Sequence, residues 1–226
     1  MTRRQQEPPQ PAPQSTPVTV PADPTQLAAR ILAHLKGEDR FILGVTGPPG
    51  TGKSTVVAAI AQALQPHRVV VVPMDGFHLA NAVIRGTPLE HRKGAIDTFD
   101  AAGYVHLMQR LHRRNEEIVY APSYVRDVEE PIAAAIAVPR EVQIVITEGN
   151  YLLAPTAQWP AARAVIDQVW YLDTPDLLRL HRLTSRHVSF GKTEPEAAAW
   201  VQSSDEVNAR MIAQTRDRAD LIIQQD

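Results

Sequence analysis

The sequence contains no cysteine, which excludes disulfides, thiolate metal sites and cysteine nucleophiles. It also lacks any apolar run approaching the roughly 20 residues that a membrane helix needs. No apolar segment follows the basic start MTRRQQEPPQ, which argues against a secretory signal. We therefore expect a cytoplasmic protein that does not associate with a membrane.

A basic stripe is missing as well. The chain has 23 lysines and arginines against 25 aspartates and glutamates, a formal net charge of −2. Nucleic acid is therefore not an expected partner, since its binding needs clustered positive charge. We expect a small molecule as the partner, and a homodimer stays open.

The length of 226 residues and the hydrophobic fraction of 44% suffice for one sizeable core but not for two ordinary domains. Seven of the 19 prolines lie between Pro8 and Pro24. Residues 1–24 show no apolar periodicity and are rich in proline and glutamine, which predicts a disordered tail. The folded domain is expected over residues 25–226.

Apolar runs alternate with segments of helical periodicity along this domain. Several runs are rich in β-branched residues and do not alternate with polar ones, as in a parallel sheet covered on both faces. This predicts a single α/β domain with a five-stranded parallel sheet flanked by helices. The expected strands are 41–45, 68–72, 142–147, 168–172 and 221–224, and the expected helices are 26–36, 53–64, 100–114, 176–187 and 196–216.

The segment 47–54, GPPGTGKS, fits the phosphate-loop pattern G-x-x-x-x-G-K-[ST] without a mismatch. It follows a predicted strand and opens a predicted helix, so an ordinary glycine- and proline-rich loop is the weaker interpretation. Lys53 would contact the β- and γ-phosphates, and the Ser54 hydroxyl would bind Mg²⁺. ATP and Mg²⁺ are thus the expected cofactors, and the expected nucleotide-binding residues are Gly47, Gly50, Thr51, Gly52, Lys53, Ser54 and Thr55.

Two carboxylates directly follow apolar segments that belong to predicted buried strands, Asp75 after 70–74 and Glu148 after 143–147. The carboxyl ends of parallel strands line the ligand crevice, so both acids should face the phosphates. We assign Asp75 as the catalytic base for an acceptor hydroxyl. Glu148 is assigned to the magnesium shell and to the adjoining substrate site. The alternative for each is a helix cap or a surface acid.

Three arginines, Arg179, Arg182 and Arg186, lie along one face of the predicted helix 176–187. A polar stretch with a glycine follows, as expected for a mobile lid near residues 182–195 that carries cations over the γ-phosphate. Arg186 is the expected catalytic cation. A solvated charged face is an equally good interpretation for Arg179.

Besides the phosphate loop, five segments form a recognisable set: MDGFH (74–78), RKGAIDTFD (92–100), PSY (122–124), EGNYLL (148–153) and RHVSFGK (186–192). Together these segments resemble the uridine kinase and bacterial pantothenate kinase superfamily of P-loop kinases, and residues 186–192 resemble the lid of its nucleoside-kinase-like branch. The likeness runs from about residue 41 to 223.

The resemblance implies a P-loop NTPase fold with a five-stranded kinase core and a catalytic aspartate at Asp75. It implies acceptor contacts from Lys93, Asp100, Tyr124 and Arg126. Pantothenate kinases have a histidine where this chain has Arg126, and uridine kinases carry Arg-Asp in the lid where it has Arg-His. The expected acceptor is a nucleoside such as uridine, with a fructose-like sugar or a pantothenate-like alcohol as alternatives.

Some single residues keep two interpretations. Asp100 could equally cap the helix that begins at Ala101. Tyr124, Phe77 and Tyr151 offer aromatic faces near the predicted crevice, with function slightly favoured over packing for Tyr124. His78, His91 and His187 could contact substrate, but their spacing does not predict a metal site. The three tryptophans, Trp159, Trp170 and Trp200, are expected to be packing residues.

Other functions are less consistent with the sequence. A regulatory GTPase would need a guanine-reading N-K-x-D segment, which the chain lacks. An ATP-driven motor would typically need a longer chain with a subunit interface. A binding protein with a relict loop would have little reason to keep Lys53, Ser54, Asp75 and Glu148 together. The non-enzyme alternative that stays open is a nucleotide-binding regulatory NTPase.

Overall fold

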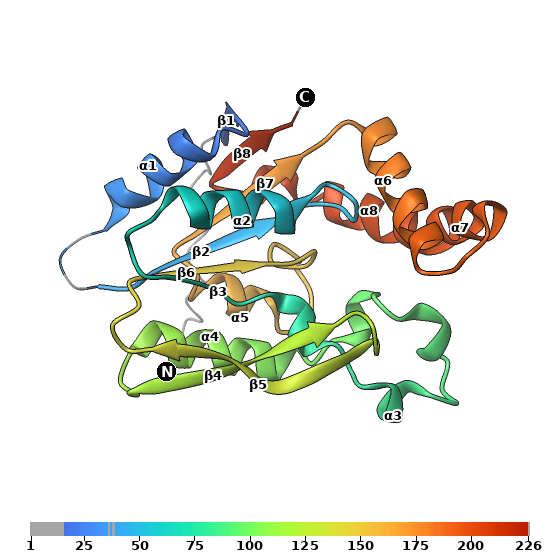
Figure 1. Cartoon of the computed structure of the whole chain (residues 1–226), viewed down its shortest axis with the longest axis horizontal. Helices are drawn as coiled ribbons and strands as arrows, with labels where there is room; N and C mark the ends of the chain where they lie inside the picture. The colour runs from blue at the N-terminus through green and yellow to red at the C-terminus, as the bar shows by residue number, and fades with distance from the viewer. Residues whose placement is uncertain (1–15, 36, 38, 226) are drawn as a thin grey trace, which may run out of the picture.

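A six-stranded parallel sheet forms the centre of the protein (Figure 1). The computed structural model describes residues 16–35, 37 and 39–225. In spatial order the strands are β1 (Val18–Pro21), β8 (Leu221–Gln224), β7 (Gln168–Asp173), β2 (Phe41–Thr46), β6 (Ile144–Glu148) and β3 (Val69–Val71).

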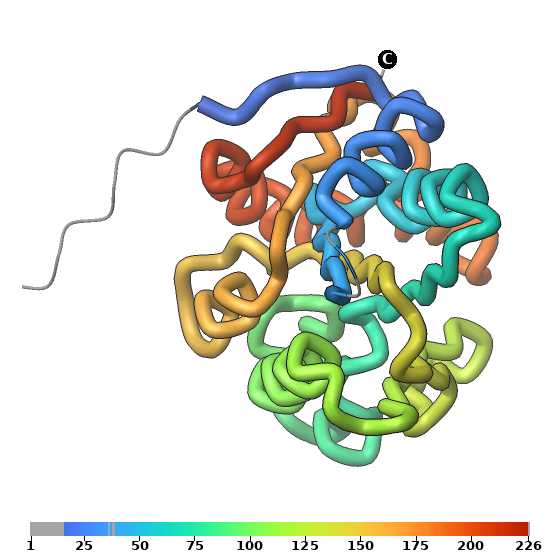
Figure 2. Tube along the Cα trace, turned by 90° about the vertical axis from the view of Figure 1, so that its left-hand side faces the viewer, coloured from blue at the N-terminus to red at the C-terminus, as the bar shows by residue number. Residues whose placement is uncertain are grey.

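Both faces of the sheet are apolar because successive residues of each central strand point to opposite sides. In β2, Ile42 joins the core on one face, whereas Leu43 and Val45 join the core on the other. One face is covered by α1 (Pro24–His34) and α2 (Lys53–Ala63). The other is covered by α4 (Ala101–Arg113), α5 (Trp159–Arg163) and α8 (Glu206–Ala213). Figure 2 shows the α1 and α2 layer in blue and cyan and the α4 layer in green on opposite sides.

Three further groups of elements lie beside the sheet. An antiparallel hairpin of β4 (Ile118–Val125) and β5 (Glu130–Pro139) lies next to α4. Helices α6 (Asp176–Ser189) and α7 (Glu194–Trp200) project from the sheet and lead into a π-helical turn, Val201–Asp205 (Figure 1). Short turns follow β3: Met74–Phe77, α3 (Asn81–Ile84), Glu90–Arg92 and Ile96–Thr98, and a further turn, Arg216–Arg218, precedes β8.

The predicted α/β fold is confirmed, and all five predicted strands are present. The predicted strand count is wrong by one, because β1 pairs with β8 in register Val18↔Leu221. The segment predicted as a tail, 1–24, therefore includes residues of the sheet, while residues 1–15 lie outside the described residues.

One helix also differs from expectation. The helix predicted over 196–216 is three segments, because the π-helical turn separates α7 from α8. Among the described residues, no helix is both long and apolar enough to cross a membrane.

Candidate active site

A cavity of about 650 Å³ opens at the carboxyl ends of β2, β6 and β3. Its walls come from the phosphate loop, the β4–β5 hairpin, the turns after β3, and helices α6 to α8. The structure brings most of the predicted site residues to this one cavity. Those that line it are Gly50, Gly52, Lys53, Ser54, Thr55, Asp75, Lys93, Tyr124, Arg126, Glu148 and Arg186.

The phosphate loop takes its shape from left-handed backbone that suits glycine. Gly50 has φ +83°, and a Cβ there would lie 2.7 Å from the carbonyl oxygen of Arg179. A Cβ on Gly47 would come within 2.6 Å of the Leu172 carbonyl oxygen. Thr51 faces inward, where its hydroxyl donates to the Pro48 carbonyl at 2.9 Å. Gly47 and Thr51 therefore shape the loop and do not line the cavity.

Lys53, the first residue of α2, lies folded within the phosphate loop. Its ammonium donates to the carbonyl oxygens of Gly47 at 2.8 Å and Pro48 at 3.0 Å. Burial lowers the pKa of Lys53 to about 8, against the opposing influence of the nearby Glu148 carboxylate. The side chain is therefore still mainly protonated at pH 7, and its charge is held where phosphate oxygens would bind.

Ser54 and Glu148 form the pair that could hold Mg²⁺. The Ser54 hydroxyl donates to Glu148 Oε1 at 2.7 Å, and burial raises the pKa of Glu148 although Lys53 opposes that shift. Within the described part of the chain, no group of three or more His, Cys, Asp or Glu side chains could hold a metal ion. One hydroxyl and one carboxylate still fit Mg²⁺, which keeps several waters and takes further oxygens from phosphates.

Asp75 lies in a short 3₁₀ turn that is separated from the end of β3 by two residues. The turn packs closely on the hairpin, because a Cβ on Gly76 would lie 2.5 Å from the Pro122 carbonyl oxygen. The Asp75 side chain is 30% exposed, and its Oδ2 is 3.7 Å from Nη2 of Arg126. The predicted base thus lies in the cavity that also holds the phosphate loop and an arginine of the hairpin.

The three arginines of α6 have three different environments. Arg179 is buried and pairs with Glu206 at 2.5 Å, so it has a structural role. Arg182 lines the cavity and donates to the Thr51 carbonyl oxygen at 3.2 Å. Arg186 also lines the cavity, and burial, assisted by the charge of Arg126, lowers its pKa. Only Arg182 and Arg186 therefore reach the predicted site.

Aromatic and polar side chains from the turns after β3 and from β4 line another part of the cavity, which we call the acceptor end (His78, Asn81, Lys93, Phe99 and Tyr124). The His78 ring lies 4.0 Å from that of Phe99 and 4.6 Å from that of Tyr124. The Lys93 ammonium donates to Asn81 Oδ1 at 2.6 Å and lies 5.5 Å from the centre of the Tyr124 ring. This end of the cavity thus offers both ring faces and hydrogen-bonding groups.

Three residues considered for substrate contact lie elsewhere. Asp100 caps α4 by accepting from the Gly103 amide at 2.8 Å and does not line the cavity. Phe77 packs edge-on against Tyr104 at 5.3 Å. Tyr151 is buried, with its hydroxyl donating to the Gly94 carbonyl at 2.6 Å. The structure therefore supports capping and core roles for these residues.

Other lining residues had no clear signal in the sequence. Trp200, expected to pack in the core, lines the cavity beside Lys192, whose ammonium is 4.7 Å from its ring centre. The π-helical turn brings Asp205 to the lining, where it bonds His187 at 2.8 Å. Asn81 also lines the cavity, as does His78, which was considered among the substrate contacts. A π-helical turn leaves little trace in sequence periodicity, which explains why Asp205 was missed.

A phosphate loop that shares one cavity with a strand-end aspartate and with arginines from a projecting helix is the arrangement of a P-loop kinase. Residues 42–226 match the Phosphoribulokinase / Uridine kinase family. The chain belongs to this family, and it is a small-molecule kinase.

Named relatives agree on the reaction class. A Schizosaccharomyces pombe protein named "Putative uridine kinase C227.14" is 31% identical over 210 residues, covering 88% of this chain and 89% of that protein. A crystal structure described as a "putative fructose transport system kinase", from Silicibacter sp. TM1040, superposes with a TM-score of 0.82 at 36% identity, covering 88% and 98% of the two chains. A pantothenate kinase of Sorangium cellulosum is 28% identical over 83% of this chain and 70% of its own length.

Proposed function

We propose that the protein transfers the γ-phosphate of ATP to a hydroxyl group of a nucleoside such as uridine. One observation carries the proposal: a single cavity joins the phosphate loop to the acceptor end, with Asp75 on its lining. An acceptor bound against Tyr124 and a triphosphate bound at Lys53 would therefore share one enclosed space.

In the proposed reaction, the acceptor hydroxyl oxygen forms a bond to the γ-phosphorus while the bond from that phosphorus to the β–γ bridging oxygen breaks. The hydroxyl proton passes to Asp75, so the products are ADP and the phosphorylated acceptor. Lys53 and Arg186 lie on the lining of the same cavity and would bind phosphate oxygens. Mg²⁺, held by Ser54 and Glu148, would supply charge neutralisation to the phosphates.

The ring faces at the acceptor end support a nucleoside. Tyr124 and His78 lie with their rings 4.6 Å apart on the cavity lining, where a planar base could stack. Fewer of the expected aromatic rings are available to a base than the sequence suggested, because Phe77 and Tyr151 pack in the core. Asn81 and Lys93 favour a sugar as the second candidate, since both can bind hydroxyl groups, and the Silicibacter relative is described as a fructose transport system kinase.

The acceptor can be identified by comparing kcat/KM for uridine, cytidine, fructose and pantothenate at saturating MgATP. We expect uridine or cytidine to be preferred by more than tenfold, because a site that binds a specific polar group rejects analogues lacking it. A preference for fructose or pantothenate of that size would overturn the nucleoside assignment. If none of these acceptors increased ATP consumption, the proposed reaction itself would be wrong.

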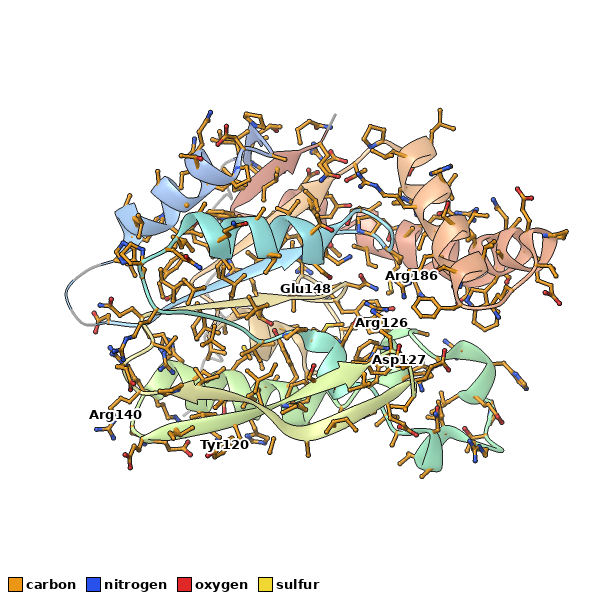
Figure 3. The ribbon with its side chains drawn as sticks, in the orientation of Figure 1. Tyr120, Arg126, Asp127, Arg140, Glu148 and Arg186 are labelled. Carbon is orange, nitrogen blue, oxygen red and sulfur yellow. The ribbon has the colours of Figure 1, made fainter. Side chains whose placement is uncertain are left out.

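A matched pair of tyrosines on β4 tests the proposed acceptor end. Tyr124→Ala should raise the acceptor KM at least about tenfold, since base–aromatic stacking is worth about 1–3 kcal/mol. Tyr120→Ala is the control, because Tyr120 lies on the same strand but is 53% exposed on the outer part of the hairpin (Figure 3). Equal effects of the two substitutions would show that Tyr124 acts only through the hairpin structure.

A further inference from the structure

Two arginines from distant parts of the chain converge at the centre of the cavity. Arg186 extends from α6 and Arg126 from the turn of the β4–β5 hairpin, as Figure 3 shows, and both line the cavity. Burial lowers the pKa of Arg186, and the nearby positive charge of Arg126 lowers it further, so the two guanidinium groups lie within electrostatic reach of each other. Two like charges brought together in a partly buried place are unfavourable unless an anion lies between them.

The carboxylates nearby do not fully balance these cations. Asp75 is the one acid that forms an ion pair with Arg126 among the described residues, and that contact is long, at 3.7 Å. Glu148 already accepts a hydrogen bond from Ser54. Asp205 also acts on Arg186, but it already bonds His187 at 2.8 Å. With Lys53 and Arg182 included, four cations on the lining stand against these three carboxylates, so the cavity suits an additional group with several anionic oxygens.

The turn that carries Arg126 is held in place from its opposite side. The Glu130 carboxylate accepts from the Asn81 amide at 3.0 and 3.1 Å. The Lys93 ammonium donates to the carbonyl oxygen of Glu129. These contacts join the hairpin turn to the segment after β3, so the backbone of Arg126 is fixed next to Asp75 although its side chain is 43% exposed.

We propose that Arg126 is a catalytic residue that binds the transferred phosphoryl group together with Arg186, rather than an acceptor-binding residue. The proposal rests on the phosphoryl transfer proposed above. As the bond between the γ-phosphorus and the bridging oxygen breaks and the bond to the attacking oxygen forms, negative charge spreads over the three equatorial oxygens of the γ-phosphoryl group. The planar guanidinium of Arg126 then exchanges its long contact with Asp75 for those oxygens, and Asp75 receives the proton of the attacking hydroxyl.

The hydrolysis of ATP without an acceptor separates the two roles of Arg126. Water then replaces the acceptor hydroxyl, so a residue that binds only the acceptor cannot affect the rate, whereas a residue that binds the phosphoryl group must. The release of labelled phosphate from γ-labelled ATP would be measured for the full chain. Arg126→Gln should lower this rate about 100-fold, in line with the loss of one preorganised donor. Arg126→Lys should recover part of it, because the charge remains but the planar fork is lost.

Arg140→Gln is the matched control. Arg140 directly follows β5 at the other end of the hairpin, where it donates to the Asn115 carbonyl at 2.6 Å, far from the cavity lining (Figure 3). Its substitution should leave acceptor-free hydrolysis within about twofold of wild type. Thermal unfolding of each variant checks that the fold is kept. An Arg126→Gln variant with unchanged hydrolysis but a raised acceptor KM would overturn the proposal.

A second measurement covers the case of very slow hydrolysis. Aluminium fluoride bound with MgADP imitates the planar phosphoryl group, and we expect it to tighten MgADP binding to wild type. Arg126→Gln should lose most of this gain while binding MgADP alone normally. A full gain in the variant would contradict our assignment. If wild type showed neither hydrolysis nor this gain, the proposal would be wrong together with the proposed function.

Discussion

Replacing the phosphate-loop lysine with an apolar side chain of similar length should make the nucleotide-free protein more stable. Lys53 is buried, and its pKa falls from 10.5 to about 8, chiefly because burial disfavours the ammonium form. The folded protein therefore carries a buried charge that nucleotide binding requires and folding does not. Lys53→Met removes this charge and keeps most of the side-chain volume.

The expected gain follows from the pKa and from the hydrogen bonds that are lost. A decrease from 10.5 to about 8 corresponds to roughly 3 kcal/mol of free energy of unfolding at pH 7, at about 1.4 kcal/mol per pH unit. The Gly47 carbonyl oxygen loses the Lys53 donor, which costs about 1 kcal/mol, whereas the Pro48 carbonyl oxygen still accepts from the Thr51 hydroxyl. The net gain should be about 2 kcal/mol, or a rise in Tm of roughly 4–8 °C for a domain of this size.

The difference between the two proteins should depend on pH. Between pH 8 and 10.5 unfolded Lys53 binds a proton more often than folded Lys53 does, so the stability of wild type rises with pH in this window. Below pH 8 both states are protonated and the destabilisation is fully present. The advantage of Lys53→Met should therefore be largest at pH 7 and shrink from pH 8 to pH 10.

Urea and thermal unfolding, followed by circular dichroism, provide the assay. Lys192→Met is the control, because the Lys192 ammonium lies 4.7 Å from the centre of the Trp200 ring and its replacement should change stability by less than about 1 kcal/mol. Lys53→Met should also lose the rise in Tm that MgATP gives wild type. A Lys53→Met variant less stable than wild type at pH 7, or an advantage that does not shrink above pH 8, would refute the reasoning.

Three further substitutions test individual assignments. Asp75→Asn should lower kcat by about 10²–10⁴-fold and leave MgATP affinity nearly unchanged in calorimetric titrations, and a loss seen only in ATP binding would place Asp75 with the nucleotide or metal instead. Glu148→Gln should raise the Mg²⁺ concentration for half-maximal activity at least about tenfold, and an unchanged Mg²⁺ titration would contradict its place in the metal shell. Asp100→Ala should cost about 1 kcal/mol of unfolding free energy with an unchanged acceptor KM, because Asp100 caps α4, and the reverse outcome would return it to the acceptor site.

The parts of the protein that the sequence predicts well depend on local patterns. The apolar runs of β2 and β6 mark central strands because both of their faces are buried. The phosphate loop is recognisable because its glycines, Lys53 and Ser54 act within one short segment. Asp75 and Glu148 could be placed at the cavity because each lies at or shortly after the carboxyl end of a strand of the same parallel sheet.

Elements that depend on distant partners were not predicted. Strand β1 has four residues and ends at Pro21, and it exists because β8, some 200 residues away, offers a free edge. The sequence of β5, EPIAAAIAVP, has little β propensity, and Ala134 has a positive φ. The strand pairs with β4, whose Val119 and Ala121 join the core on the α4 side. Exposed and buried residues alternate at the start of β4, but its sequence, IVYAPSYV, does not alternate polar and apolar residues there, so it carries no clear signal of this strand.

The arginines of α6 show why periodicity gives a face of a helix but not the role of each residue on it. Spacings of three and seven correctly indicate a shared side for Arg179, Arg182 and Arg186, but that side faces different neighbours along the helix. Near the start of α6 it meets Glu206 of α8, so Arg179 is buried in an ion pair. One turn later Arg182 meets the backbone of the phosphate loop. A further turn along the helix, Arg186 lies near Arg126 of the β4–β5 hairpin, which is sixty residues earlier in the chain. The role of Arg186 therefore depends on this distant element. Substituting the three residues should therefore affect folding, loop geometry and phosphoryl transfer respectively, although the sequence places all three on one charged stripe.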